Sequence, residues 1–127
     1  RDVAYENVID APNDSIKISR LCKNLNISIQ KKELAISEQC FDEALLLIEK
    51  SNSIPGINNL KISIDQNFTR KGNYKKSLEL LFRLKQIADK IFLSHHTVDS
   101  HIRNIYAKLE VHSRSSAISK AIREKLL

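Results

Sequence analysis

The residues best suited to chemistry lie between residues 86 and 109, where an apolar stripe runs beside polar side chains. The stripe consists of Val98, Ile102, Ile105 and Leu109, at steps of four, three and four residues. Such spacing predicts one buried face of an amphipathic helix. The flanking and outward positions carry donors or small side chains and one acid, namely Thr97, Ser100, Arg103, Asn104, Ala107, Lys108 and the acid Asp99. Because arginine can bind both acceptors of a guanine edge, this face suits the major groove of DNA.

A short helix that precedes residue 92 must position the helix that carries this stripe. Ile87, Ala88 and Ile91 give it an apolar face with a small residue where helices cross. The break falls at residues 92–94, and Ser94 is a strong helix cap. Two short helices joined by a tight turn form a helix-turn-helix, whose exposed helix reads base edges while neighbouring side chains hold phosphates. The side chains best placed for phosphate are those of Ser94, Thr97, Lys108 and Arg114.

These residues resemble a known family, the LuxR-type (GerE-type) helix-turn-helix of bacterial transcription regulators. The matching motifs are Ile87-Ala88-Asp89-Lys90, Leu93-Ser94, Thr97-Val98, His101-Ile102-Arg103-Asn104-Ile105, Lys108-Leu109, Val111 and Ser113-Arg114-Ser-Ser-Ala117. The resemblance implies a four-helix domain that binds double-stranded DNA as a homodimer, with a recognition helix over 95–109 and a pairing helix over 113–127. It implies base contacts from Asp99, Ser100 and Arg103, and backbone contacts from Thr97, Lys108 and Arg114. The stripe Ala117, Ile118, Ala121 and Ile122 suits the pairing helix, although it could equally be intramolecular core.

The sequence departs from the family pattern at three places. Asp99 stands where a basic or neutral residue is common, so a base contact there would go to a cytosine amino group or be absent. Glu110 replaces the usual glycine after the recognition helix. The turn expected before Ile87 is missing, so either one helix runs through or residues are missing there. The chain also begins with Arg1, and we expect it to be part of a longer regulator.

The charge of the chain is unevenly divided. Residues 1–68 carry 8 basic and 10 acidic side chains, whereas residues 69–127 carry 13 basic and 5 acidic ones. The whole formal net charge of +6 therefore belongs to the second half. A basic unit joined to a mildly acidic one indicates a polyanion-binding module attached to a part with another role.

The first half predicts helical hairpins. One helix begins near Ile16 after a cap at Asp14 or Ser15, a second pattern runs from Leu34 to Ile48, and residues 51–56 have turn chemistry. A third run ends at residues 71–73. Residues 41–48 echo residues 74–81 at an offset of 33, with Gln39 at the earlier turn position, and residues 60–84 resemble one tetratricopeptide unit. A plain pair of antiparallel hairpins explains the same positions.

Several other classes of protein are disfavoured. Cys22 and Cys40 have no CxxC spacing, which fits buried thiols or a reducing compartment. No apolar run is long enough to span a membrane. His95, His96, His101 and His112 have no Cys or acid at ligand spacing, so we expect no metal and no cofactor. Without a Gly-rich phosphate loop, a nucleophile elbow or a carboxylate pair, we expect no enzyme.

The sequence therefore predicts an all-α bacterial, cytoplasmic regulator in two parts. Residues 1–72 form helical hairpins, tetratricopeptide-like or plain, that serve as an input or docking region for a protein partner. Residues 73–127 form the LuxR-type DNA-binding domain. The alternative is a helical adaptor or dimerisation module that does not bind DNA.

Overall fold

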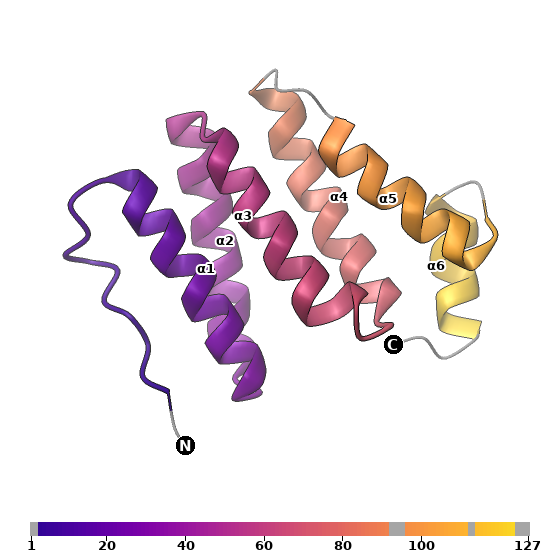
Figure 1. Ribbon diagram of the computed structural model, residues 1–127, viewed down its shortest axis with the longest axis horizontal. Coiled ribbons are helices and arrows are strands. Elements are labelled where there is room, and N and C mark those ends of the chain that lie inside the picture. Colours follow the sequence, from indigo (N-terminus) through magenta and orange to yellow (C-terminus); the bar gives the residue numbers. More distant parts are fainter. Residues whose placement is uncertain (1–2, 92–95, 112–113, 124–127) are drawn as a thin grey trace. The chain divides into compact units, whose positions relative to one another are not determined.

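The computed structural model describes residues 3–91, 96–111 and 114–123, without the side chains of residues 96, 97, 115–117, 121 and 123. These residues form helices and connecting segments and contain no strand, in agreement with the all-α prediction. The elements are α1 (Asp14–Gln30), α2 (Leu34–Ser51), α3 (Ile54–Ile64), η1 (Asp65–Thr69), α4 (Tyr74–Lys90), α5 (His96–Leu109) and α6 (Arg114–Arg123) (Figure 1). They divide into two compact units, Arg1–Ser63 and Ile64–Leu127. The functional boundary predicted between residues 72 and 73 stays a prediction.

Unit 1 is built on the antiparallel pair α1 and α2 (Figure 1). The sequence predicted that Asp14 or Ser15 caps α1, but the cap is Asn13. Its side chain accepts the Ile16 backbone N–H at 2.9 Å. Its buried face includes Ile18, Leu21 and Leu25. Cys22 and Cys40 are also buried, as free thiols. Burial raises the pKa of the Cys22 thiol to about 12, which leaves it unreactive at neutral pH.

The predicted turn at residues 51–56 is shorter than the sequence indicated. Asn52 ends α2 in the left-handed region at φ 51°, and α3 already begins at Ile54. Pro55 is tolerated there because the first turn of a helix has backbone N–H groups without helical partners. The Ser53 hydroxyl accepts one of them, the Gly56 N–H, at 3.0 Å. The Pro-Gly pair therefore starts a helix and is not part of the loop.

Two hairpin turns in the chain repeat the same hydrogen bonds forty residues apart. At the first, Lys32 has φ 60°, the Glu33 N–H donates to the Ser28 carbonyl at 2.9 Å, and a buried hydroxyl pair joins Ser28 to Ser37 at 2.7 Å. At the second, Gly72 has φ 80°, the Asn73 N–H donates to the Phe68 carbonyl at 2.9 Å, and the pair is Thr69 and Ser77 at 2.8 Å. The turns thus use equivalent residues at 32 and 72 and at 37 and 77.

The offset of 33 residues predicted from the sequence is wrong as a structural register. Phe41 lies in the middle of α2, whereas Tyr74 is the first residue of α4. Gln39, expected at a turn, is also inside α2. The apolar runs aligned at 33 because any two amphipathic helices share a 3.6-residue period. The tetratricopeptide-like interpretation stays a prediction.

Unit 2 is organised around α4, which packs against η1, α5 and α6. Asn73 caps α4, its side chain accepting the Lys76 N–H at 3.3 Å. The helix then continues to Lys90 without interruption. The helix therefore runs through the position of the missing turn before Ile87. Its buried residues include Leu78, Leu81, Leu84 and Ala88.

Candidate nucleic-acid interface

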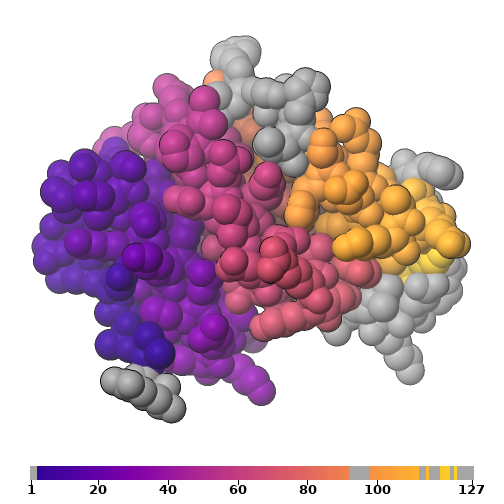
Figure 2. All heavy atoms as spheres, viewed as in Figure 1, coloured from indigo at the N-terminus to yellow at the C-terminus, as the bar shows by residue number. Residues whose placement is uncertain are grey.

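The apolar stripe of α5 is buried as predicted. Val98, Ile102, Ile105 and Leu109 are at most 5% exposed. The side chains of Arg103, Asn104, Ala107 and Lys108 are exposed, and the α5 surface is orange in Figure 2. A helix with one face in the core and a polar, basic opposite face can enter a groove of DNA without unfolding its domain. This is the geometry that the sequence pattern predicted.

The three predicted base-contacting residues are placed near the start of α5. The Ser100 side chain accepts a hydrogen bond from Arg103 Nη2 at 3.3 Å. Asp99 forms an ion pair with Lys85 of α4, whose Nζ lies 2.8 Å from Asp99 Oδ1. Asp99 also lies in the first turn of α5, where a negative charge is favourable to the helix dipole. The base contacts themselves stay predictions.

Lys85 was missed by the sequence analysis, and it joins the two helices of the motif. Its ammonium also lies 3.7 Å from Asp89 Oδ1 on its own helix. The hydrogen bond to Asp99 is the main cause that raises the pKa of Lys85. The lysine and Asp99 side chains are each about one third exposed, at 33% and 34%. The pair therefore orients α5 on α4 but stabilises the unit by less than about 1 kcal/mol.

This raised pKa gives a pH dependence. The pKa of Lys85 in the folded protein is above its ordinary value of 10.5. The charged lysine therefore contributes to the free energy of unfolding below pH 10.5, and this contribution is lost as the pH rises through the folded pKa. We expect the free energy of unfolding to fall in this alkaline range, and to fall less in Lys85→Met. Urea denaturation at a series of pH values measures this. Tyr106, whose pKa is raised by burial, contributes in the same direction, so the comparison is repeated in a Tyr106→Phe background. Identical alkaline slopes for the wild type and Lys85→Met would contradict the role of the pair.

Two predicted phosphate-binding side chains rest on aromatic rings of α4. Lys108 Nζ lies 5.8 Å from the centroid of the Tyr74 ring, and the Arg114 guanidinium lies 4.2 Å from that of Phe82. Cations above ring faces are attracted by the ring quadrupole. Tyr74 and Phe82 thus hold both cations, a role that their positions in the sequence did not indicate. Of the other predicted phosphate contacts, Ser94 and the Thr97 side chain lie outside the described residues.

The turn after α5 tolerates the missing glycine. Glu110 adopts φ 57°, and its N–H donates to the Ala107 carbonyl at 3.1 Å. The next N–H, of Val111, donates to the Tyr106 carbonyl at 3.0 Å. This closes the helix in the left-handed manner typical of a glycine. The departure from the family pattern therefore changes the residue and not the conformation.

A side chain in the left-handed region is strained relative to glycine. We expect Glu110→Gly to raise the free energy of unfolding of unit 2 by about 0.5–1 kcal/mol. Hydrogen exchange of α5 and α6 amides would report it. Glu110→Ala, which removes only the exposed carboxylate and its 3.9 Å contact with Lys120, is the control and should not stabilise. If Glu110→Gly and Glu110→Ala changed the free energy of unfolding equally, the cause would be the lost charge and not the backbone conformation.

An acidic residue from η1 lies beside α5. Asp65 Oδ1 is 3.5 Å from His101 Nε2, and its other oxygen accepts from Arg70 Nε at 2.6 Å. A cavity of about 320 Å³ is bounded by these elements and by Asn104, Ile105 and Lys108. No group of three or more His, Cys, Asp or Glu in the described part of the chain could hold a metal ion. Asp65 therefore belongs to the packing of α5.

The helix predicted to pair protomers is observed as α6, Arg114–Arg123, and its pairing role stays a prediction. Ile118 is half-buried, and Ile122 is 49% exposed. The side chains of Ala117 and Ala121 lie outside the described residues. An exposed isoleucine at the end of this stripe leaves apolar surface on α6.

The end of α4, the buried stripe of α5 and its basic outer face define the class of helix-turn-helix domains. Residues 83–121 match the family model of the bacterial regulatory proteins, luxR family (GerE). The match confirms the resemblance seen in the sequence, and this segment is a LuxR-type helix-turn-helix. No curated protein and no solved structure matches the chain. Within the described part of the chain, no helix has the length and apolar character needed to cross a membrane.

Proposed function

We propose that this protein is a sequence-specific DNA-binding transcription regulator that inserts α5 into the major groove. The observation that carries the proposal is the division of α5 into two faces. Four apolar side chains on one face are almost fully buried, and Arg103, Asn104 and Lys108 on the other are exposed. The surrounding half of the chain holds all the excess positive charge. Positive charge supplies the sequence-independent part of DNA affinity.

In this proposal the side chains of α5 have separate roles. Ser100 and Arg103 contact base edges, and Arg103 binds a guanine edge with both of its terminal nitrogens. Asp99 accepts from a cytosine amino group while it stays beside Lys85. Ser94, Thr97, Lys108 and Arg114 contact the phosphate backbone. The aromatic rings under Lys108 and Arg114 reduce the conformational freedom that these cations lose on binding.

We further propose that α6 pairs two protomers through Ala117, Ile118, Ala121 and Ile122. The exposed Ile122 supports this, because an apolar side chain at a helix surface favours burial against a partner. A two-fold dimer would read a two-fold symmetric DNA site. In the same proposal the protein acts in the bacterial cytoplasm, where chromosomal DNA is accessible. It has no enzymatic role in this proposal.

The affinity for duplex DNA across a salt series tests DNA binding. If Lys108 and Arg114 of two protomers each neutralise one phosphate, the logarithm of the association constant should fall with the logarithm of salt concentration with a slope of roughly −3 to −4. A flat dependence would instead support the alternative function, a helical adaptor or dimerisation module. The Lys108→Ala and Arg114→Ala chains should each reduce the slope by roughly 2 for a dimer.

For unit 1 we propose a docking role toward a protein partner. Its helices carry exposed apolar side chains, Leu34 at 73% and Leu46 at 67% exposed. Its mildly acidic composition does not favour DNA.

A further inference from the structure

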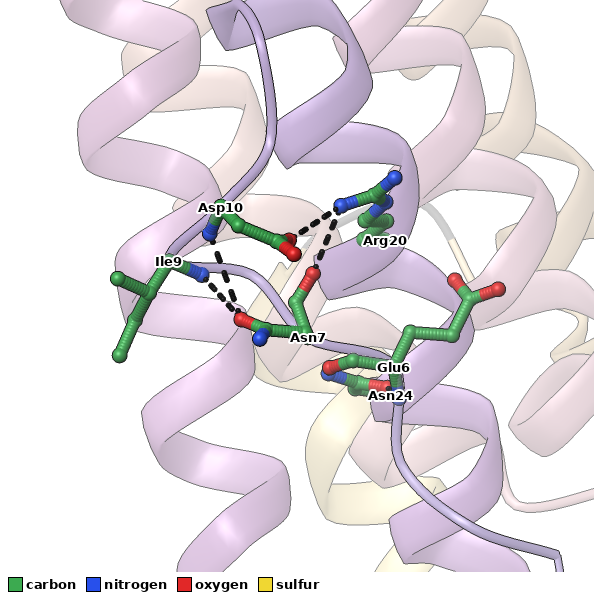
Figure 3. A network of polar contacts seen from close by, with 6 residues as sticks. All are labelled: Glu6, Asn7, Ile9, Asp10, Arg20 and Asn24. Carbon is green, nitrogen blue, oxygen red and sulfur yellow. Dashed lines mark hydrogen bonds and ion pairs between the residues drawn. The ribbon is translucent and has the colours of Figure 1, made fainter.

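The N-terminal segment, residues 3–11, lies along α1 and is held by both backbone and side-chain contacts (Figure 3). It turns at residues 8–10, where the Ala11 N–H donates to the Val8 carbonyl at 3.3 Å. The Asn24 side chain accepts the Glu6 N–H at 2.7 Å and donates from Nδ2 to the Glu6 carbonyl at 2.9 Å. Asn24 is only 6% exposed, so its amide meets the peptide group as a neighbouring β-strand would. One helix turn earlier, Arg20 donates to the Asn7 carbonyl at 3.0 Å. Contacts of this kind recognise an extended chain whatever its side chains are.

The side chains of this segment are recognised by cations of α1 and its C-terminal turn. Arg20 Nη1 lies 2.9 Å from Asp10 Oδ1, and Lys23 Nζ lies 3.7 Å from Glu6 Oε1. The Tyr5 ring lies under Lys31, 4.7 Å from its Nζ, and the Tyr5 hydroxyl donates to Glu33 at 2.6 Å. This row of contacts suits an acidic segment with an aromatic residue ahead of its acids and a turn at its second acid.

The N-terminal segment does not fill the groove that it covers. A cavity of about 430 Å³ lies under it, with Leu21, Ile36, Gln39 and Cys40 among the residues on the helix side. Ile9 borders this cavity but is 94% exposed, and Val3 is 52% exposed, so neither of these apolar side chains fills it. Glu6 Oε2 is buried without a hydrogen-bond partner, which is unfavourable. The segment is therefore a poor fit that polar contacts hold in place.

We propose that the groove between α1 and α2 is a docking site for an acidic, non-helical segment of a partner protein, and that residues 3–11 occupy it in the partner's absence. The proposal rests on the docking role proposed above for unit 1 and is independent of DNA binding. A partner segment with an apolar side chain directed into the cavity would pack against Leu21 and Ile36, which line it. Residues 3–11 of a second copy would leave the same cavity unfilled, which favours a different protein as the occupant.

The test uses the full chain and a fluorescent peptide with the sequence of residues 3–11. Glu6→Pro removes the N–H that Asn24 accepts without altering a helix, whereas Glu6→Ala keeps that N–H and is the matched control. Because the chain's own segment competes with the peptide, releasing it should strengthen peptide binding by roughly fivefold to tenfold in Glu6→Pro. We expect no such gain in Glu6→Ala. Adding Asn24→Ala to Glu6→Pro should weaken peptide binding about tenfold with helix content unchanged.

Thiol labelling of Cys40, in a Cys22→Ala background, reports release of the segment without any peptide. Cys40 is 7% exposed and lines the cavity, so Glu6→Pro should accelerate its labelling and Glu6→Ala should not. Accelerated labelling without saturable peptide binding up to about 1 mM would overturn the proposal, and so would unchanged labelling. Peptides with a larger apolar residue in place of Val8, whose position borders the cavity, should bind more tightly. If none does, the groove serves only its own segment, and docking of a partner is excluded.

Discussion

The Arg103→Lys chain is expected to lose 5-fold to 150-fold in affinity for its preferred DNA site while its affinity for random duplex changes little. This range corresponds to the roughly 1–3 kcal/mol that a bidentate arginine contributes at a guanine. Lysine keeps the positive charge but cannot form the paired hydrogen bonds. Competition binding assays with specific and random duplexes at one salt concentration measure both affinities.

Lys108→Ala is the matched comparison, because Lys108 is an exposed cation on the same helix. It should weaken binding to specific and random DNA by the same factor and reduce the salt slope, as a phosphate contact does. Arg103→Ala should combine both effects, since it removes the charge as well. Equal losses on both DNAs for every variant would overturn this division of roles.

The second large effect is expected from the buried face of the same helix. Ile105 is 1% exposed, so Ile105→Ala should lower the free energy of unfolding of unit 2 by about 2–5 kcal/mol through lost burial and the cavity left behind. Its neighbour Asn104 is exposed, and Asn104→Ala should stay within about 0.5 kcal/mol of the wild type. Urea denaturation followed by far-UV circular dichroism measures both. A larger loss for Asn104→Ala than for Ile105→Ala would mean that the two faces of α5 are assigned the wrong way round.

The recognition helix could be predicted from the sequence because its signal is local. Val98, Ile102, Ile105 and Leu109 recur with the period of a helix, and the structure buries all four. The outward positions of Arg103 and Lys108 follow from the same period. The continuous helix α4 was one of two alternatives that the lack of a turn before Ile87 left open, and the structure shows it as one helix from Tyr74 to Lys90.

The supporting contacts of the site could not be predicted, since they join residues distant in sequence. Lys85 reaches Asp99 only because α5 folds back on α4, and no pattern marks the rings of Tyr74 and Phe82 as supports for cations. Asn24 looks like a polar interruption of the α1 stripe until the peptide group of Glu6 is placed beside it.

The turn register of the hairpins was mispredicted for a local reason. Lys32 occupies the left-handed conformation in which Gly72 is found at the second turn. A lysine carries no sequence signal for that conformation. The offset of 33 was therefore predicted from the apolar residues alone. The five-residue π-helical segment η1 adds a further irregularity that periodicity does not reveal.

Selection of preferred sites from a random pool of duplex DNA tests sequence-specific binding by α5 most directly. The proposed function predicts enrichment of a two-fold symmetric site, with the half-sites one helical turn or a multiple of it apart. Enrichment should be weaker in Arg103→Lys, which keeps the net charge of the chain. Recovery of no preferred sequence by the folded wild-type chain would contradict sequence-specific recognition and would favour an adaptor whose helices meet protein.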